Sequence, residues 1–169
     1  MTKPNSTRKA AKKKPPESHT YTLEVVILEG SITQEFAKRN PVISRTIQIR
    51  GDQTLERLHH AIFDAFDRFQ EHLYEFRFGK GPHDPHGKRF ILPAAEPAKR
   101  AGDVTQTTID TLGLKVGKGF TYRFHSGDGW GHWIKVLAID DQPPVGNYPR
   151  MTRRVGSSPP QYAPPEDGG

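Results

Sequence analysis

The stretch GFTYRFHSGDGWGHWIKVLAID, residues 119–140, consists of two strand-like runs on either side of a glycine-rich turn. The first run alternates aromatic with polar residues, and the second is mostly apolar, both of which are typical of strands. The residues SGDGWG between the two runs are those that tight turns use. The stretch therefore predicts an antiparallel hairpin, in which Gly127 and Gly129 take backbone angles that residues with a Cβ reach poorly.

Further runs predict strands that join this hairpin in a sheet. YTLEVVILE (residues 21–29) has the composition and length of a mostly buried strand. VISRTIQIR (residues 42–50) alternates, with Arg45 between isoleucines on the apolar face. HLYEFRF (residues 72–78) also alternates, so its aromatic side chains are expected in the core. A short strand is expected at residues 89–92.

TLERLHHAIFDAFDRF (residues 54–69) predicts the main helix. Thr54 suits the N-cap position, since its hydroxyl can accept a hydrogen bond from the first turn. The expected apolar stripe consists of Leu55, Leu58, Ile62, Phe66 and Phe69. His59 lies about 60° from the centre of this stripe, which favours a boundary residue over a ligand.

One helix among mostly antiparallel strands predicts an α+β fold, either a roll or a two-layer sandwich. Residues 20–141 are expected to form this single domain, with residues 30–41 as a polar loop. Residues 1–19 are basic and lack apolar periodicity, so they are expected to be disordered. Residues 142–169 are rich in proline and glycine and are expected to be extended or disordered, without regular structure.

The composition excludes several classes of protein. The 169 residues include no cysteine, which excludes disulfides, thiolate zinc sites and a cysteine nucleophile. No apolar run is long enough to cross a membrane and nothing resembles a signal peptide, so a cytoplasmic location without a membrane partner is expected. Residues 1–19 carry a net charge of +5 out of the total of +6, so the remainder is nearly neutral.

The basic tail suggests one class of partner. Its side chains could bind the phosphates of a nucleic acid without sequence specificity, and deleting residues 1–19 should then abolish such binding. The alternative is a tail that only keeps the protein soluble. The candidate binding residues of the tail are Arg8, Lys9, Lys12, Lys13 and Lys14.

The hairpin and the preceding strand also supply candidate catalytic residues. Asp128 and His132 lie across the turn and could converge. His72 or Glu75 could join them, as in a hydrolase-type or metal-dependent enzyme. Their spacing matches no established metal motif, and an extended strand points His72 and Glu75 to opposite faces. No metal and no cofactor are therefore expected.

A structural role explains the same residues. Asp128 could accept hydrogen bonds from the turn amides, and His132 could order the turn. Trp130 and Trp133 beside the turn are candidates for an exposed binding surface. Because no catalytic triad, metal motif or phosphate loop is present, the sequence favours a non-enzymatic binding or accessory module, with the enzyme as the alternative.

Four segments in this order resemble the plasmid pRiA4b Orf3-like proteins, a bacterial family found on plasmids and chromosomes: TLERLHHAIFDAF, EHLYEFRF, FTYRFHSGDGWGHWIKV and YPRMTRRVGSSPPQY. The resemblance covers about residues 20–162 and implies an α+β roll, without implying a particular activity. It places the polar positions of the family at His59, His72, Glu75, Asp128, Trp130 and His132. The chain departs from the family pattern at His125 and Ser126 before the turn, and in having no C-terminal cysteine.

Overall fold

The computed structural model describes residues 19–93, 101–142 and 145–162. The expected disordered tail, apart from His19, lies outside these residues, as does the end of the C-terminal segment. The elements in chain order are β1 (Thr20–Glu29), α2 (Gln34–Arg39), β2 (Ser44–Arg50), α3 (Leu55–Ala65), β3 (Tyr74–Phe78), β4 (Lys88–Ile91), β5 (Gly102–Asp103), the 3-10 helix η1 (Ile109–Leu112), β6 (Gly119–Phe124), β7 (Trp130–Asp140) and β8 (Arg150–Val155).

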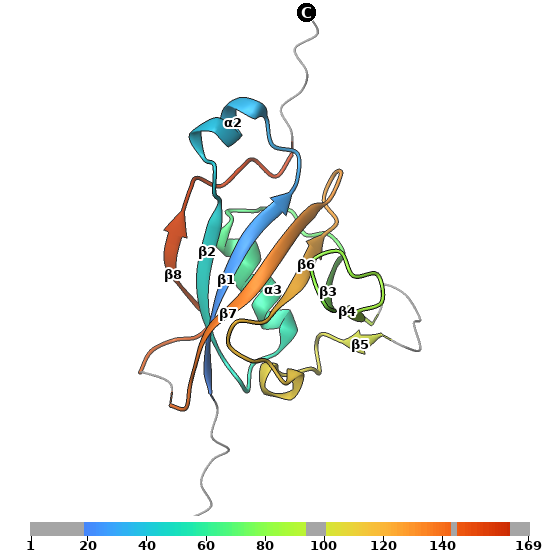
Figure 1. Cartoon of the computed structure of the whole chain (residues 1–169), viewed down its shortest axis with the longest axis vertical. Coiled ribbons are helices and arrows are strands. Elements are labelled where there is room, and N and C mark those ends of the chain that lie inside the picture. Colours follow the sequence, from blue (N-terminus) through green and yellow to red (C-terminus); the bar gives the residue numbers. More distant parts are fainter. Residues whose placement is uncertain (1–18, 94–100, 143–144, 163–169) are drawn as a thin grey trace, which may run out of the picture.

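Eight strands form one mixed sheet in the order β5-β4-β3-β6-β7-β1-β2-β8. Neighbouring strands are antiparallel, except that β4 and β5 run parallel. Figure 1 shows β8 at one end of this sheet and β4 and β5 at the other. The described chain is therefore mostly β with few helices, which is compatible with the predicted α+β class. Among the described residues, no helix has the length and apolarity needed to cross a membrane.

The predicted hairpin is confirmed. β6 and β7 pair from Gly119 opposite Lys135 to Phe124 opposite Trp130. Gly127 and Gly129 have φ angles of 61° and 95°, so both positions use the left-handed region that glycine reaches without steric cost. The backbone therefore reverses within a few residues, as the turn composition indicated.

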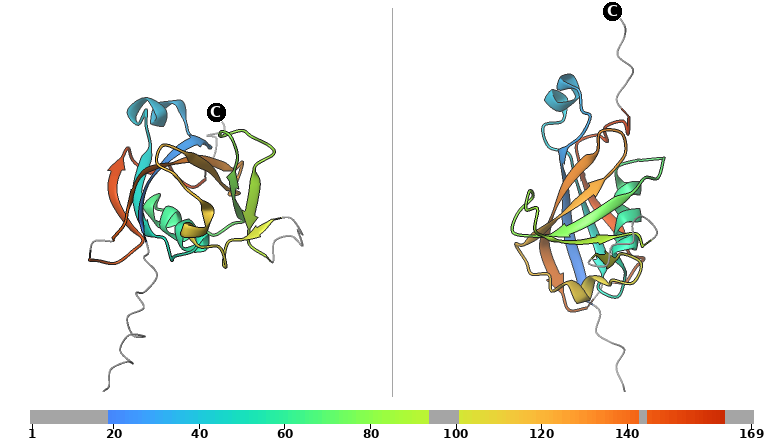
Figure 2. Two further views of the ribbon diagram at one scale, coloured as in Figure 1. Left: turned by 60° about the horizontal axis from the view of Figure 1, so that its bottom comes forward. Right: turned by 90° about the vertical axis from the view of Figure 1, so that its right-hand side faces the viewer.

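The helix α3 lies in the hollow of the curved sheet, as the two views of Figure 2 show. The predicted cap is confirmed, because the Thr54 hydroxyl accepts a hydrogen bond from the backbone N–H of Arg57 at 3.2 Å. The helix contributes to one core together with the aromatic faces of β3 and β6, as predicted. The buried aromatic residues of these two strands are Tyr74, Phe76, Phe120, Tyr122 and Phe124.

The predicted stripe of α3 is correct for four residues and wrong for the fifth. The four buried members are Leu55, Leu58, Ile62 and Phe66. Phe69 is 73% exposed, because α3 ends at Ala65 and the chain changes direction at Asp67, whose φ is 55°. Periodicity therefore overestimated the length of the helix by one turn.

Two further boundaries differ from the predictions. Residues 30–41 contain α2 instead of being only a loop, and its first turn is capped by the Thr33 hydroxyl, which accepts from Phe36 N–H at 3.2 Å. β3 begins at Tyr74, so His72 precedes the strand. The position of His72 is therefore not determined by strand alternation.

The C-terminal segment contributes β8, although its proline content argued against regular structure. The buried Arg45 of β2 explains why this segment stays on the sheet. Its guanidinium donates to the carbonyl oxygens of Val155 and Gly156 at 3.0 and 3.1 Å and to the Ser158 hydroxyl at 2.9 Å. It also donates to the Ala65 carbonyl at the end of α3 at 2.8 Å. One buried cation thus joins β2, α3 and the C-terminal segment.

Candidate functional site

Asp128 and His132 lie in different environments, which counts against the alternative that they form a catalytic pair. Asp128 is exposed in the turn after β6, and its partner is the Ser31 hydroxyl at 3.4 Å instead of the turn amides. His132 lies on the core face of β7 with none of its surface exposed. The alternation of the strand directs His132 inward, whereas the turn leaves Asp128 in solvent.

His132 forms a buried pair with Arg68. The Arg68 Nη2 donates to His132 Nε2 at 2.7 Å, and His132 Nδ1–H donates to the Tyr122 carbonyl at 3.0 Å. Burial and the Arg68 charge lower the pKa of His132 well below its usual value, so the ring is neutral at neutral pH. A general base must reach its substrate, so a fully buried imidazole with both nitrogens engaged does not fit that role.

Arg68 is a buried cation that the sequence did not single out. Its guanidinium carbon lies 5.0, 5.1 and 5.4 Å from the ring centroids of Phe66, Phe124 and Trp130. Burial lowers the pKa of Arg68 to about 10, which leaves it charged at neutral pH. Its Nη1 is buried and has no hydrogen-bond partner among the described residues. The aromatic rings therefore supply much of the environment of this charge.

His72 and Glu75 lie in different environments, because His72 precedes β3 whereas Glu75 lies within it. His72 Nε2–H donates to the Tyr162 hydroxyl oxygen at 2.7 Å, and that hydroxyl donates to Gln70 Oε1 at 2.6 Å. His72 thus holds the C-terminal segment against the residues that precede β3. The four candidate catalytic residues therefore form no common site.

Glu75 is surrounded by cations. Its carboxylate accepts from Arg89 at 2.8 Å and from Arg77 at 3.4 Å, and His125 Nε2 lies 3.7 Å away. Burial alone would raise the pKa of Glu75, but the hydrogen bond and charge of Arg89, with Arg77 and His125, lower it below its usual value. Glu75 is therefore an ionised ion-pair partner, not a general acid near neutral pH.

The two tryptophans differ in exposure. Trp130 is 1% exposed, its Nε1–H donates to the Gln161 carbonyl at 3.3 Å, and its ring lies against Gly30. The prediction that Trp130 belongs to an exposed binding surface is therefore wrong, because its side chain is part of the core. Trp133 is half-buried on the opposite face of β7, where its ring lies over Gly119 of β6. Of the two tryptophans, Trp133 remains a candidate for binding, and the candidate residues of the basic tail lie outside the described residues.

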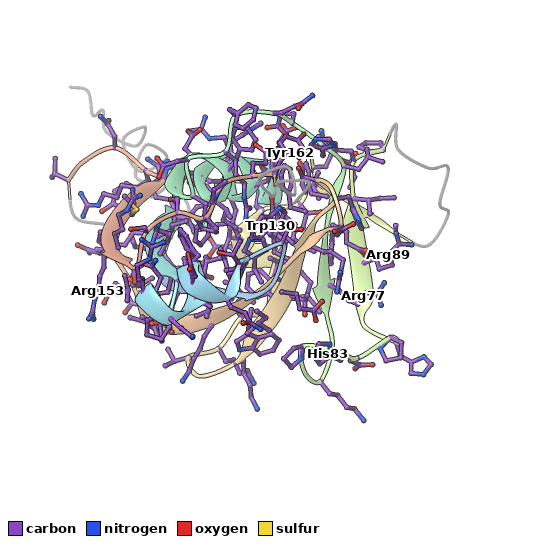
Figure 3. The ribbon with its side chains drawn as sticks, turned by 90° about the horizontal axis from the view of Figure 1, so that it is seen from above. Arg77, His83, Arg89, Trp130, Arg153 and Tyr162 are labelled. Carbon is purple, nitrogen blue, oxygen red and sulfur yellow. The ribbon has the colours of Figure 1, made fainter. Side chains whose placement is uncertain are left out.

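A row of four side chains crosses the outer face of β4, β3, β6 and β7. The register places Arg89 opposite Arg77, Arg77 opposite Thr121, and Thr121 opposite Trp133. Residues paired in this way project from the same face of a sheet. We call Arg89, Arg77, Thr121 and Trp133 the basic row. Figure 3 shows Arg77 and Arg89 on the side of their strands away from Trp130.

A groove of about 220 Å³ opens between two members of the basic row, Arg77 and Thr121, and the loop that joins β3 to β4. The loop is held over the sheet by two hydrogen bonds, from Thr121 Oγ1 to the Pro82 carbonyl at 3.3 Å and from Arg77 Nη1 to the Pro85 carbonyl at 3.4 Å. The other charged or titratable residues that line the groove are Glu75, His83, Asp84 and Arg123. The groove therefore presents charged groups and hydrogen-bond donors.

A family model described as plasmid pRiA4b ORF-3-like protein matches residues 31–169. The matched residues extend from the connection after β1 to the C-terminal end of the chain and include α3, the hairpin and the basic row. The chain belongs to the plasmid pRiA4b ORF-3-like family. The resemblance that the four sequence segments carried is confirmed.

Two proteins illustrate how far the similarity of this pRiA4b ORF-3-like protein extends. The uncharacterized protein y4hQ of Sinorhizobium fredii is 30% identical over 131 residues, which are 76% of this chain and 60% of that protein. The chain thus spans less than two thirds of the length of y4hQ. The crystal structure of a protein of unknown function from Methanosarcina mazei Go1, MM3350, matches with a TM-score of 0.65 at 21% identity. That match covers 85% of this chain and 72% of MM3350, and it supports the fold alone.

In this pRiA4b ORF-3-like protein, His59 is fully buried instead of lying at the boundary of the core. Its Nδ1 lies 2.6 Å from the Tyr122 hydroxyl, and its Nε2 lies 2.9 and 3.2 Å from the two carboxylate oxygens of Glu71. Burial lowers the pKa of His59 to about 4, although Glu71 opposes this effect. Sequence reasoning missed Glu71, because this residue is 12 positions away in the connection between α3 and β3.

Proposed function

We propose that this protein is a non-enzymatic binding module that holds a single-stranded nucleic acid across the basic row. The observation that supports this function most directly is the register, which sets two arginines, a threonine and a half-buried tryptophan side by side on one sheet face. Guanidinium groups bind phosphates in a defined geometry, and aromatic residues on a sheet stack on bases. The same face therefore offers contacts to both parts of a nucleotide.

The arginine side chains of this face are accessible to an anionic ligand. Arg77, Arg89 and Arg123 share two carboxylates, those of Glu75 and Glu29. The three arginine side chains are 29%, 36% and 36% exposed, so a phosphate can approach them without unfolding the sheet. Asp84, whose pKa is lowered by hydrogen bonds from backbone N–H groups, lines the same groove, so three carboxylates balance the three guanidinium charges. A phosphate therefore binds this surface by replacing a carboxylate partner of an exposed arginine, which supports binding of modest strength.

The basic tail adds to this affinity under the proposal. Its Lys and Arg residues precede β1 and supply further contacts that do not depend on base sequence. We also propose that the architecture is a roll, since the curvature of the sheet around α3 supports that description. The hydrolase-type alternative has less support, because its four candidate residues lie in separate environments.

Fluorescence anisotropy of a labelled single-stranded oligonucleotide tests the proposal, with the full chain at two salt concentrations. Arg77→Gln should reduce the slope of log affinity against log salt by about 0.7, as expected for one lost phosphate contact. Trp133→Leu should weaken binding by about tenfold through lost stacking. Arg39→Gln on the exposed surface of α2 is the matched control and should leave the affinity unchanged.

Deletion of residues 1–18 separates the tail from the sheet. The truncated chain should bind the oligonucleotide more weakly than the full chain but still saturably. Arg77→Gln should weaken this remaining binding further. Loss of all binding on truncation, together with unchanged affinity in both sheet variants, would show that only the tail binds nucleic acid. No binding by the full chain at low salt would overturn the proposal entirely. Circular dichroism of each variant verifies that the fold is retained.

A further inference from the structure

We propose that His59, His60 and Glu71 form a binding site for a divalent transition metal ion of the Zn²⁺ type. Each residue offers one donor atom, and these three atoms lie within 4.8 Å of one another. None of the three belongs to the basic row, so the inference is independent of the proposed nucleic-acid surface. The sequence alone predicted no metal site.

The local structure explains how these residues meet. Consecutive residues of a helix point about 100° apart, so His59 faces the core while His60 faces solvent. The chain after α3 then reverses and carries Glu71 back over the exposed edge of the helix, where its carboxylate contacts both imidazoles. A carboxylate therefore bridges an inward and an outward histidine, an arrangement that the spacing along the chain does not reveal.

The distances fit a metal ion with only small side-chain adjustments. Four bonds of about 2.1 Å at tetrahedral angles would separate neighbouring donor atoms by about 3.4 Å. The Glu71 Oε1 lies 3.2 Å from His59 Nε2 and 3.7 Å from His60 Nδ1. These two separations fall on either side of the required value, and all three donor atoms lie within 4.8 Å of one another.

The surroundings of His59 resemble those of a metal-bound histidine. Metal-ligating histidines usually hydrogen-bond through the other ring nitrogen, which fixes the orientation of the ring. His59 Nδ1 lies 2.6 Å from the Tyr122 hydroxyl, and the ring is stacked on Tyr74 at a centroid distance of 3.6 Å with an interplanar angle of 1°. The Nε2 of His59 is therefore held toward Glu71 before any metal binds.

The proton balance of metal binding is simple at this site. Without metal, His59 carries its proton on Nε2, which donates to Glu71, and the Tyr122 O–H donates to Nδ1. When the metal takes the Nε2 lone pair, the imidazole proton moves to Nδ1 and is donated to the Tyr122 oxygen. Tyr122 keeps its own proton, because a hydroxyl can serve as donor or acceptor.

The donor set identifies the class of ion. Two imidazole nitrogens and one carboxylate suit Zn²⁺ and its first-row neighbours such as Co²⁺, whereas Mg²⁺ and Ca²⁺ prefer oxygen donors alone. His60 and Glu71 are 55% and 52% exposed. The remaining coordination position therefore faces solvent, where water can occupy it.

Calorimetric titration of the untagged, chelator-treated full chain with Zn²⁺ tests the inference, and the visible absorption of bound Co²⁺ reports the coordination geometry. We expect one equivalent of metal and a tetrahedral Co²⁺ spectrum. His60→Ala and Glu71→Gln should each weaken binding tenfold or more, which corresponds to about 1.4 kcal/mol. Both residues are exposed, so these variants are expected to fold.

His86→Ala is the matched control, since His86 is an exposed histidine in the loop between β3 and β4. The His86→Ala variant should bind Zn²⁺ with the same affinity as the unmodified chain. Tyr122→Phe should weaken metal binding by about tenfold and alter the Co²⁺ spectrum, as expected for a positioning residue. Absence of stoichiometric binding, or a tenfold effect that is missing in either His60→Ala or Glu71→Gln, would overturn the inference.

Discussion

The Nη2 of Arg68 lies 2.7 Å from the Nε2 of His132, which joins the chain just after α3 to the core face of β7. Both side chains are buried, and none of the carboxylates among the described residues forms an ion pair with Arg68. A neutral imidazole therefore accepts from a charged guanidinium inside the core. Each group satisfies a hydrogen-bonding requirement of the other, so their contributions to stability should be coupled.

A double-mutant cycle measures this coupling. Arg68→Met and His132→Leu should each lower the free energy of unfolding by about 1–3 kcal/mol, because each leaves a buried polar partner unsatisfied. The double variant should lose less than the sum of the two losses, with a coupling energy of about 1 kcal/mol. Urea unfolding of the four proteins provides the values. Additivity within about 0.3 kcal/mol would contradict the coupling.

The lowered pKa of His132 predicts a pH dependence of stability. In the unfolded chain this residue titrates near its usual value of about 6.5, whereas the folded protein resists protonation of the buried ring. The stability that His132 contributes is fully present above about pH 6.5. It is lost as the pH falls toward the pKa of His132 in the folded protein, since the unfolded state then binds a proton that the folded state does not.

In the His132→Leu variant, the free energy of unfolding should therefore fall less between about pH 7.5 and about pH 5.5 than it does in the unmodified protein. One proton that only the unfolded state binds changes this free energy by up to about 1.4 kcal/mol per pH unit. Urea unfolding at both pH values gives the comparison. The exposed His86 provides the reference, and His86→Ala should follow the pH profile of the unmodified protein. Parallel profiles for His132→Leu and the unmodified protein would show that His132 does not resist protonation.

Arg45 should control the attachment of β8. Arg45→Met removes five hydrogen bonds to buried or half-buried acceptors, and it should lower the free energy of unfolding by about 3 kcal/mol or more. Hydrogen exchange should show that the β8 amides lose protection before those of β1 and β7. Arg154→Gln removes only exposed contacts, those with the Asp67 carboxylate and the Ser158 hydroxyl, and should cost at most about 1 kcal/mol. Equal effects of the two substitutions would contradict the assigned role of Arg45.

The turn between β6 and β7 offers a test of backbone strain without packing effects. A Cβ at Gly127 would have its nearest neighbour at 3.9 Å, so Gly127→Ala meets only the cost of a φ of 61°. That cost is about 1 kcal/mol, and it should appear as a lower melting temperature. Gly127→Asn should be milder, because asparagine tolerates the left-handed region. An alanine variant that melts like the unmodified protein would disprove the strain.

Several features followed from local patterns in the sequence. The Thr54 cap, the hairpin with Gly127 and Gly129, and the aromatic core faces of β3 and β6 are each specified within one turn or one strand. Such features depend on steric preference and side-chain alternation over a few residues. Family membership was visible for the same reason, since it rests on four short segments in order.

The predictions that were wrong concern residues whose placement depends on distant parts of the chain. Phe69 continued the helical period but lies beyond the end of α3. The strand β8 formed in a proline-rich segment because Arg45 binds it from 110 residues away. Local propensity cannot register a stabilising contact of this kind. Trp130 likewise flanks an exposed turn, yet its ring faces inward and packs against Gly30 and Arg68.

The sequence by itself determined that strands predominate over helices, and it determined the hairpin, the start of α3 and the family of this protein. Only the tertiary structure decided which polar residues meet: His132 with Arg68, His59 with Glu71 and Tyr122, and Arg77 with Arg89 and Trp133 on one row. The reason is physical, because turns and alternation act over a few residues. The meeting of distant side chains depends instead on strand register and on the path of the chain between elements, which no local pattern specifies.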